Sequence, residues 1–229
     1  MVKRLAIIPA RSGSKRIKDK NIKLFKKQPI INYTLALCKK SKMFNKIHIS
    51  TDSDQIKKIV KKKGFSIDFM RPKKLSKKNI PLIDVAKFVF KEYKKLKLKF
   101  DQIWIFSACA PLLKLHDIIR AEKIFKKFNQ ENIVIPVCEY NAPIEWAFIM
   151  KKNKLHHFFK NQKKLMTPSQ NLKKKYFDLG YFFVMSPKHL SQNFFNSKFS
   201  GCPIPKIRAV DIDDVDDWLL AEKLFQKNK

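Results

Sequence analysis

The sequence predicts an α/β fold, with a single domain over residues 1–229 built on a mainly parallel sheet that carries helices on both faces. Apolar runs of strand length alternate with helical stretches as far as Pro143, which is the order that parallel sheets require. The run Gln102–Ser107 is almost wholly apolar, as a central strand covered on both faces should be. With 229 residues, 45% of them hydrophobic, the chain can bury one sizeable core.

The first part of the chain supplies three expected strands and two expected helices. Leu5–Pro9 is an apolar run that stops at a polar loop, and a helix is expected to begin over Pro29–Leu37. Lys46–Ser50 is a short second strand. Asp54–Lys63 has apolar residues at helical spacing and is followed by a glycine, which commonly ends a helix. Ile67–Phe69 is expected to form a third strand.

The middle of the chain repeats this pattern. Leu82–Lys95 places its apolar residues on one helical face, and the apolar strand Gln102–Ser107 follows it. Asp117–Phe128 is a further expected helix, and Asn132–Cys138 is a further apolar strand.

The alternation stops after Pro143. Two apolar stretches, 147–150 and 155–159, flank a lysine-rich turn and predict a hairpin. We therefore expect an inserted arm or lid at about 143–176. Tyr181–Met185 is expected to return to the sheet, and Asp216–Phe225 to form the last helix.

The formal charge of +32 would favour a nucleic-acid partner if it were focused on one element. Lysines are instead spread along nearly the whole chain, which a general lysine bias also explains, so we expect no physiological nucleic-acid partner. No apolar run approaches the roughly 20 residues that span a bilayer. The first nine residues resemble a strand more than a signal peptide. We therefore expect a cytoplasmic protein with no membrane partner.

A basic, glycine-containing loop, Pro9–Asn21, directly follows the first expected strand. Ligands of open α/β sheets bind beyond the carboxyl ends of the strands, and a small-residue turn lets backbone N–H groups approach an anion. Arg11, Lys15, Arg16 and Lys20 add charge suited to phosphate. A solvated basic loop is an equal alternative in so lysine-rich a chain. The sequence contains neither G-x-G-x-x-G nor G-x-x-x-x-G-K, which excludes ordinary dinucleotide and P-loop sites.

An acidic cluster precedes the last expected helix. Asp211 and Asp213, here called the acidic pair, would point to the same side of a strand ending because side chains alternate. Two carboxylates on one side suit Mg²⁺, with phosphates and water completing its shell. Asp214 is expected to be a helix N-cap, and Asp216 and Asp217 to lie in the first helical turn. A structural role thus explains half of the cluster, and metal binding is favoured for the acidic pair.

Together, the basic loop and the acidic pair predict nucleotidyl transfer, in which cations neutralise a triphosphate while an incoming oxygen attacks the α-phosphorus. No strong general base is evident, and Asp211, acting through the metal or a water, is the candidate. A nucleic-acid-binding protein built on a disabled transferase fold is the alternative from another class.

Five segments carry a family resemblance. They are 6–15 with Lys20-Asn21, Ser50-Thr51-Asp52, Arg71-Pro72, Ala108-Cys109-Ala110-Pro111-Leu112 and Asp211-Ile212-Asp213. These segments resemble the cytidylyltransferases that activate nonulosonic acids, the family that includes the CMP-sialic acid synthetases. In order, they match the N-terminal signature, the second strand end, the start of the nucleotide-side loop, the turn after the central strand and the metal pair. The resemblance spans nearly all of the chain.

The resemblance implies a Rossmann-like nucleotidyltransferase fold with Mg²⁺ as cofactor. The anomeric hydroxyl of an acidic nine-carbon sugar would attack the α-phosphorus of CTP, giving a CMP-sugar and pyrophosphate. The implied nucleotide-binding residues are Ala10, Arg11, Ser12, Gly13, Lys15, Lys20, Asn21 and Ala108. The implied catalytic residues are Arg11, Lys15 and Asp211, the metal ligands Asp211 and Asp213, and the sugar contacts Gln170 and Asp178. The family further implies a homodimer joined through the arm, and a product used for surface glycan or flagellin glycosylation.

Three segments are similar to the branch of the family that activates pseudaminic acid. They are Lys15-Arg16-Ile17, Ser169-Gln170-Asn171-Leu172 and Tyr176-Phe177-Asp178-Leu179-Gly180. N-acetylneuraminic, legionaminic and 3-deoxy-manno-octulosonic acid remain open as alternative substrates. Some positions depart from the family pattern: Ser76–Leu82 lacks the usual acidic residues and threonines, Glu145 replaces a common glutamine or basic residue, and Pro168 a common arginine.

Overall fold

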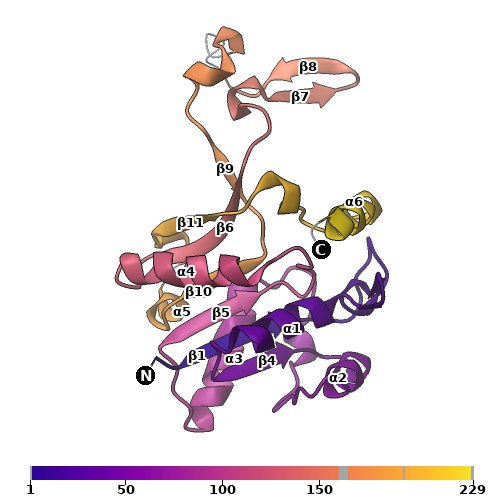
Figure 1. Cartoon of the computed structure of the whole chain (residues 1–229), viewed down its shortest axis with the longest axis vertical. Coiled ribbons are helices and arrows are strands. Elements are labelled where there is room, and N and C mark those ends of the chain that lie inside the picture. The colour runs from indigo at the N-terminus through magenta and orange to yellow at the C-terminus, as the bar shows by residue number, and fades with distance from the viewer. Residues whose placement is uncertain (1, 160–164, 193, 228–229) are drawn as a thin grey trace.

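The computed structural model describes residues 2–159, 165–192 and 194–227. Its body is a seven-stranded sheet with the order β11-β6-β10-β5-β1-β4, in which β9 also pairs with β6 (Figure 1). The strands are β1 (Arg4–Pro9), β4 (Lys46–Ser50), β5 (Gln102–Phe106), β6 (Ile133–Glu139), β9 (Tyr176–Asp178), β10 (Phe182–Met185) and β11 (Phe199–Pro203). β1 runs parallel to β4 and β5, and β11 runs parallel to β6. β10 runs antiparallel to both of its neighbours. The expected mainly parallel sheet is confirmed.

Helices cover both faces of this sheet, as expected. Ala6 and Ile8 of β1 point into a core shared with α1 (Ile31–Ser41), α2 (Asp54–Lys61), α4 (Leu115–Lys127) and α6 (Val215–Lys227). Leu5 and Ile7 point the other way, into a core shared with α3 (Leu82–Lys95) and α5 (Lys188–Ser191). This alternation follows from the period of two along a strand.

Short elements complete the body. Two-residue strands β2 (Leu24–Phe25) and β3 (Gln28–Pro29) pair with each other. The single-turn helices are η1 (Lys20–Ile22), η2 (Lys73–Leu75), η3 (Ile144–Trp146), η5 (Ser169–Asn171), η6 (Phe194–Asn196) and η7 (Lys206–Arg208). No described helix is long and apolar enough to cross a membrane.

The prediction of a strand at Ile67–Phe69 is wrong. The sheet ends at β4, and in place of a strand Asp68 and Phe69 form a bend beside it. Phe69 stacks on His48 with 4.4 Å between ring centroids. The apolar run is therefore used for packing over the sheet edge and makes no strand ladder.

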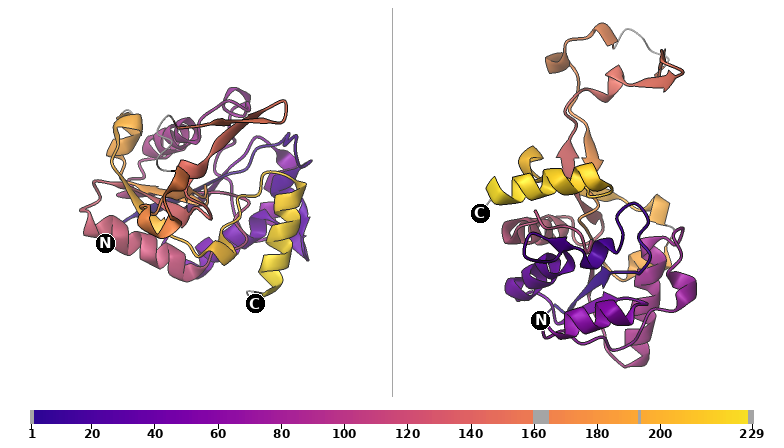
Figure 2. Two further views of the ribbon diagram at one scale, coloured as in Figure 1. Left: turned by 90° about the horizontal axis from the view of Figure 1, so that it is seen from above. Right: turned by 90° about the vertical axis from the view of Figure 1, so that its right-hand side faces the viewer.

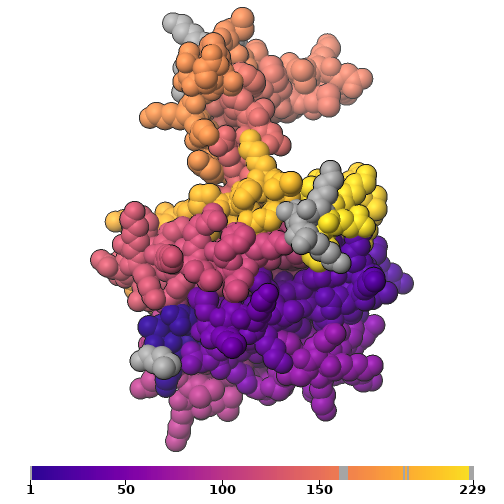
Figure 3. Space-filling model, in the orientation of Figure 1, coloured from indigo at the N-terminus to yellow at the C-terminus, as the bar shows by residue number. Residues whose placement is uncertain are grey.

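The hairpin expected after Pro143 is confirmed as β7 (Phe148–Lys151) paired with β8 (Lys154–His157). Lys152 and Asn153 turn the chain with φ angles of 47° and 64°. The hairpin stands clear of the body, which it joins through β6 and β9 (Figures 2 and 3). Every residue of β7 and β8 is exposed. Residues 160–164 of the expected arm lie outside the described residues.

Candidate active site

The basic loop begins where β1 leaves the sheet, and a carboxylate from the neighbouring strand end holds it in place. Asp52 follows β4 and accepts hydrogen bonds from the Ser12 amide at 3.0 Å and the Ser12 hydroxyl at 3.1 Å. Burial raises the pKa of Asp52, but these hydrogen bonds, one from its own amide and the charge of Arg71 leave it below its usual value. Gly13 turns the loop at a φ of 73°, a conformation that favours glycine.

Asn21 connects this loop to the turn after β5. Its side-chain amide donates to the Arg11 carbonyl at 2.9 Å, and its oxygen accepts from the Cys109 thiol at 3.4 Å. The guanidinium of Arg11 makes only long contacts, at 3.3 and 3.4 Å, with the carbonyls of Ser12 and Gly13. Among the described residues, no carboxylate pairs with Arg11 or Lys15, so both charges are available to a ligand.

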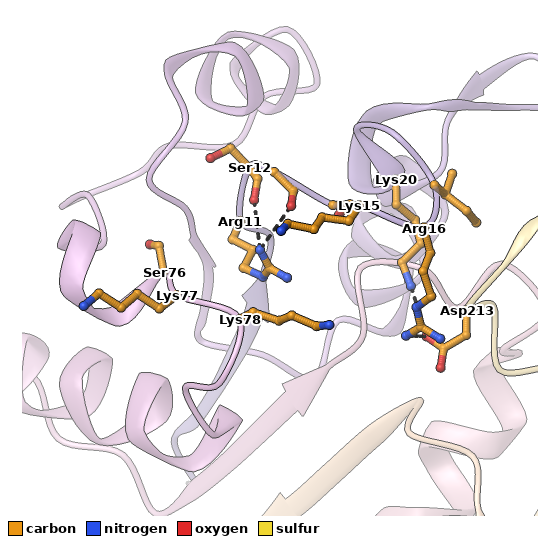
Figure 4. A pocket seen from close by; sticks show the side chains of 12 residues that line it. Arg11, Ser12, Lys15, Arg16, Lys20, Ser76, Lys77, Lys78 and Asp213 are labelled. Atoms are coloured by element: carbon orange, nitrogen blue, oxygen red, sulfur yellow. Dashed lines mark hydrogen bonds and ion pairs between the residues drawn. The ribbon is translucent and has the colours of Figure 1, made fainter.

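An open cavity of about 380 Å³ lies over the loop. Six cationic side chains line it, with Asp213 the one carboxylate among its described lining residues (Figure 4). The cations are Arg11, Lys15, Arg16, Lys20, Lys77 and Lys78. Lys77 and Lys78 belong to the segment that departs from the family pattern, so this chain adds positive charge there. Such a concentration of cations suits a polyphosphate.

A second cavity of about 320 Å³ adjoins the first and shares five lining residues with it, Arg11, Ser14, Lys20, Lys77 and Lys78. Arg71 lines this second cavity and is only 5% exposed, yet its Nε and Nη2 atoms have no hydrogen-bond partner. Burial lowers the pKa of Arg71, the charge of Asp52 raises it, and the charge of Arg11 lowers it further. Buried donors without partners are costly, so Arg71 is poised for an acceptor supplied by a ligand.

The acidic cluster that precedes α6 lies beside the first cavity, which Asp213 lines. Asp214 caps α6 by accepting from the Asp217 amide at 3.0 Å, and Asp217 accepts in return from the Asp214 amide at 3.1 Å. The expected N-cap, and the expected place of Asp216 and Asp217 in the first turn, are confirmed. Asp213 instead faces the basic loop, where Arg16 lies at 2.9 Å and Lys20 at 3.6 Å.

Asp211 lies near Asp213 and beside the turn that precedes β10. Burial raises the pKa of Asp211, the charge of Asp213 raises it further, and Lys20 opposes both. A Cβ placed on Gly180 would lie 4.0 Å from a carboxylate oxygen of Asp211. Asp178 accepts from the Gly180 amide at 2.8 Å, and its charge also acts on Asp211. Asp178 and Asp211 therefore both lie beside Gly180, and Asp213 is near enough for its charge to act on Asp211.

Five of the residues expected in the site line neither cavity, and Asp178 and Asp211, beside Gly180, are two of them. Ala10 and Ala108 are buried in the core beneath the loops and line neither cavity. Gln170 lines a separate cavity of about 280 Å³ at the base of the arm. The predicted roles of these residues stay predictions.

Sequence reasoning missed the placement of Asp52 and Arg71 in the site. Both residues lie in segments that carry the family resemblance, but nothing local shows that Asp52 holds the basic loop or that Arg71 is buried without partners. Arg16 was noted for its charge and for its place in Lys15-Arg16-Ile17, but its contact with Asp213 joins positions far apart in the sequence.

Comparisons with known proteins agree with this geometry. A family model described as cytidylyltransferase matches residues 5–187, a stretch that includes the basic loop. The chain belongs to the cytidylyltransferase family. The resemblance carried by the sequence segments is thereby confirmed.

Relatives of this cytidylyltransferase match along its whole length. A pseudaminic acid cytidylyltransferase of Campylobacter jejuni is 32% identical over 99% of this chain and 98% of the relative. A CMP-N,N'-diacetyllegionaminic acid synthase of Legionella pneumophila is 25% identical over 98% and 97%. The solved structure of CMP:2-keto-3-deoxy-manno-octonic acid synthetase complexed with CTP has a TM-score of 0.72 at 12% identity and covers 99% of this chain and 100% of that one. That structural likeness confirms the nucleotidyltransferase fold.

Proposed function

We propose that this protein transfers CMP from CTP to a nonulosonic acid, with pseudaminic acid as its substrate. The observation that carries the proposal is the cavity in which six cations face Asp213 across the end of the sheet. The relative from Campylobacter jejuni, which is named for pseudaminic acid, supports the choice of sugar.

The first cavity would hold the triphosphate of the nucleotide, and the adjoining second cavity would hold its base. Arg11, Lys15 and Lys20 would hold the triphosphate, because their charges meet on one side of the first cavity. Arg71 would donate to an acceptor on the base, because it lines the second cavity and two of its buried nitrogen atoms have no hydrogen-bond partner. A carbonyl beside the glycosidic nitrogen is such an acceptor, and cytosine and uracil both carry one while adenine does not. Arg71 therefore favours a pyrimidine, and the choice of CTP over UTP rests on the family.

The acidic pair fits a divalent cation. Burial and the charge of Asp213 raise the pKa of Asp211, and Arg16 and Lys20 already approach Asp213, so a further positive charge between the two carboxylates would be favourable. The described residues hold no group of three or more His, Cys, Asp or Glu side chains able to bind a metal. Two carboxylates, with phosphate and water completing the shell, are a ligand set that suits Mg²⁺. When bound, Mg²⁺ would neutralise charge on the phosphates.

The chain's own residues would promote an in-line displacement at the α-phosphorus. The sugar's anomeric hydroxyl forms the new P–O bond, the bond to the pyrophosphate oxygen breaks, and the hydroxyl proton leaves to water or to Asp211. Arg11 and Lys15 stabilise the charge that gathers on the departing pyrophosphate. Asp178, beside Asp211, and Gln170, at the base of the arm, are the proposed sugar contacts.

We also infer a homodimer that forms through the arm. Met150, Leu155 and Phe158 are 68%, 61% and 56% exposed, and an isolated two-stranded hairpin is marginally stable in water. An exposed apolar surface of this kind is typical of an interface.

We place the enzyme in the cytoplasm. All four cysteines are buried and free, which suits a reducing compartment.

The test is pyrophosphate release with each of CTP, UTP, ATP and GTP, against pseudaminic, N-acetylneuraminic, legionaminic and 3-deoxy-manno-octulosonic acid. We expect release with CTP and pseudaminic acid, and none after Mg²⁺ is removed by chelation. Equal release with UTP would contradict the nucleotide assignment, and a higher kcat/KM with another acid would contradict the choice of sugar. Absence of release with every pair would favour the non-catalytic alternative.

A further inference from the structure

The acidic pair lies on a segment that belongs to no strand. The main-chain hydrogen bonds of residues 210–213 all go to side chains. Val210 is held by Tyr181, the Ile212 carbonyl accepts from Lys20 at 2.6 Å, and the Asp213 amide donates to Asp217 at 2.9 Å. Without a sheet ladder to fix its spacing, the segment takes its shape from these side chains.

Tyr181 holds the front of this segment. Its phenol oxygen accepts from the Val210 amide at 2.9 Å, and it lies 2.7 Å from the Arg208 carbonyl and 2.9 Å from the Val210 carbonyl, to one of which it donates. The side chain is only 2% exposed. Its own carbonyl accepts from the Ser107 amide at 2.9 Å, where β5 ends. The phenol thus fixes the segment relative to the central strand.

Arg208 reinforces the same end. It forms a buried two-point ion pair with Asp117 of α4, one contact of which is 2.9 Å, and it donates to the Leu112 carbonyl at 3.3 Å. Arg208, whose carbonyl lies near the Tyr181 phenol, is therefore itself held in place by its side chain.

Asp217 holds the rear of the segment. One of its oxygen atoms accepts from the amides of both Asp213 and Asp214, at 2.9 and 3.1 Å. The main chain that carries Asp211 and Asp213 is thus held at two places, the Val210 amide and the Asp213 amide.

We propose that Tyr181 and Asp217 are positioning residues that set the spacing of the acidic pair and thereby its affinity for a divalent cation. The inference rests on the proposed function of that pair. Neither residue is among the proposed metal ligands or substrate contacts. Tyr181 holds the main chain before Ile212, and Asp217 holds it after Ile212. Loss of either contact would let the carboxylates of Asp211 and Asp213 move apart.

The experiment measures Mn²⁺ binding to the full chain by titration calorimetry with neither CTP nor sugar present, so that no turnover is needed and no Mn²⁺ is taken up by free nucleotide. Tyr181→Phe keeps the buried ring and removes the phenol oxygen, and we expect it to weaken Mn²⁺ binding about tenfold. The Mg²⁺ concentration for half-maximal pyrophosphate release should rise by a similar factor, while saturating Mg²⁺ should restore most of kcat.

The matched control is Tyr93→Phe. Tyr93 is also a fully buried phenol with two hydrogen-bond contacts, at 2.7 Å to Asp68 and 3.0 Å to His48, but it lies in the core on the other face of the sheet. We expect it to lower the melting temperature as Tyr181→Phe does while leaving Mn²⁺ affinity unchanged. If Tyr181→Phe and Tyr93→Phe lose Mn²⁺ affinity equally, the loss is caused by general destabilisation and the proposal is overturned.

Asp217 provides a second pair of variants that does not depend on a buried ring. Asp217→Ala and Asp217→Asn both remove the negative charge, but only asparagine keeps an oxygen that can accept from the two amides. We expect Asp217→Ala to bind Mn²⁺ more weakly than Asp217→Asn. Equal affinities would overturn the role of Asp217, and this comparison remains available if Tyr181→Phe does not fold.

Asp211→Asn separates failure of this inference from failure of the proposed function. If the wild-type protein binds Mn²⁺, Asp211→Asn does not, and Tyr181→Phe matches the wild type, the acidic pair is a metal site and the positioning role is wrong. If the wild type and Asp211→Asn bind Mn²⁺ equally, the metal site and this inference are both overturned.

Discussion

Among single residues, Arg11 provides the most direct test of the basic loop. Its guanidinium has no carboxylate partner among the described residues and lines both cavities. We expect Arg11→Ala to lower kcat/KM roughly a hundredfold, which corresponds to about 3 kcal/mol of transition-state stabilisation, with little change in melting temperature. Lys57→Ala on α2 is the control, because it removes an exposed cation remote from the cavities. Unchanged kinetics for Arg11→Ala would mean that the loop is merely solvated.

The aspartates around α6 divide into two kinds. Asp211→Asn or Asp213→Asn should abolish Mg²⁺-dependent turnover, and the double variant should add little, because residues that act as one unit are not additive. Asp214→Ala should instead cost about 1 kcal/mol of folding stability through the lost cap. Mg²⁺-titrated activity and thermal melting of each variant distinguish the two kinds. An Asp214→Ala variant that is stable but inactive would reverse the assignment.

His48 on β4 makes folding stability depend on pH. Burial lowers the pKa of His48 to about 4, although the charge of Asp68 raises it and those of Lys46 and Arg71 lower it. The unfolded chain, with an ordinary histidine pKa of about 6.5, therefore takes up this proton first as pH falls. The free energy of unfolding should drop by about 3 kcal/mol between pH 6.5 and 4.

Denaturant unfolding at several pH values measures this loss. His48→Phe keeps an aromatic ring against Phe69 and removes the titrating group, so its stability should change less over the same pH range. Parallel curves for the wild type and the variant would show that another group carries the pH dependence.

At the scale of elements, the hairpin β7–β8 tests assembly separately from folding. Met150 is 68% exposed within the chain, so a charge there costs the monomer little. We expect Met150→Asp to convert a dimer into a monomer in light scattering, with the far-UV circular dichroism unchanged. Leu96→Asp is the control, since Leu96 is 56% exposed on the body and should leave the dimer intact. A wild-type monomer would contradict the proposed interface.

The elements that the sequence predicts well are those specified locally. Apolar runs identified β1, β5 and β6, and helical spacing identified α2 and α3. β11 was missed because its Gly201 and Pro203 are types depleted from strands. The structure needs that glycine, since a Cβ there would lie 2.8 Å from Val137 of β6. The run at Ile67–Phe69 failed for the opposite reason: a short apolar run cannot tell a strand from a packed bend.

In the site, too, features set by neighbours in the chain can be predicted from the sequence, and contacts between distant segments cannot. Asp214 as a cap follows from neighbours in the chain, so the sequence is sufficient to predict it. Tyr181 and Arg71 act through contacts with segments about 20 or more residues away, which no local pattern reveals. The direction of β10 was also hidden, because a run of four apolar residues looks the same for either direction.

At the scale of the whole molecule, the net charge of +32 predicts weak, salt-sensitive contact with any polyanion. Single-stranded DNA should bind at low salt and be released near 0.15 M salt, because charges spread over the surface are screened beyond about 8 Å. Asp211→Asn should bind DNA as the wild type does while losing turnover. Fluorescence anisotropy across a salt series checks both, and tight DNA binding at 0.15 M salt would favour the alternative function.

The reversed direction of β10 also constrains how this family can change. A strand parallel to β5 would end at the edge of the sheet where the cavities lie, whereas the antiparallel β10 begins at that edge. The chain coming down the arm through β9 therefore arrives at the acidic pair within three residues, Leu179, Gly180 and Tyr181. Surface loops can normally be exchanged between relatives without disturbing the chemistry. Here a graft of the arm would have to carry residues 178–181 with it, so the proposed dimer contact and the proposed metal site would be inherited as one module.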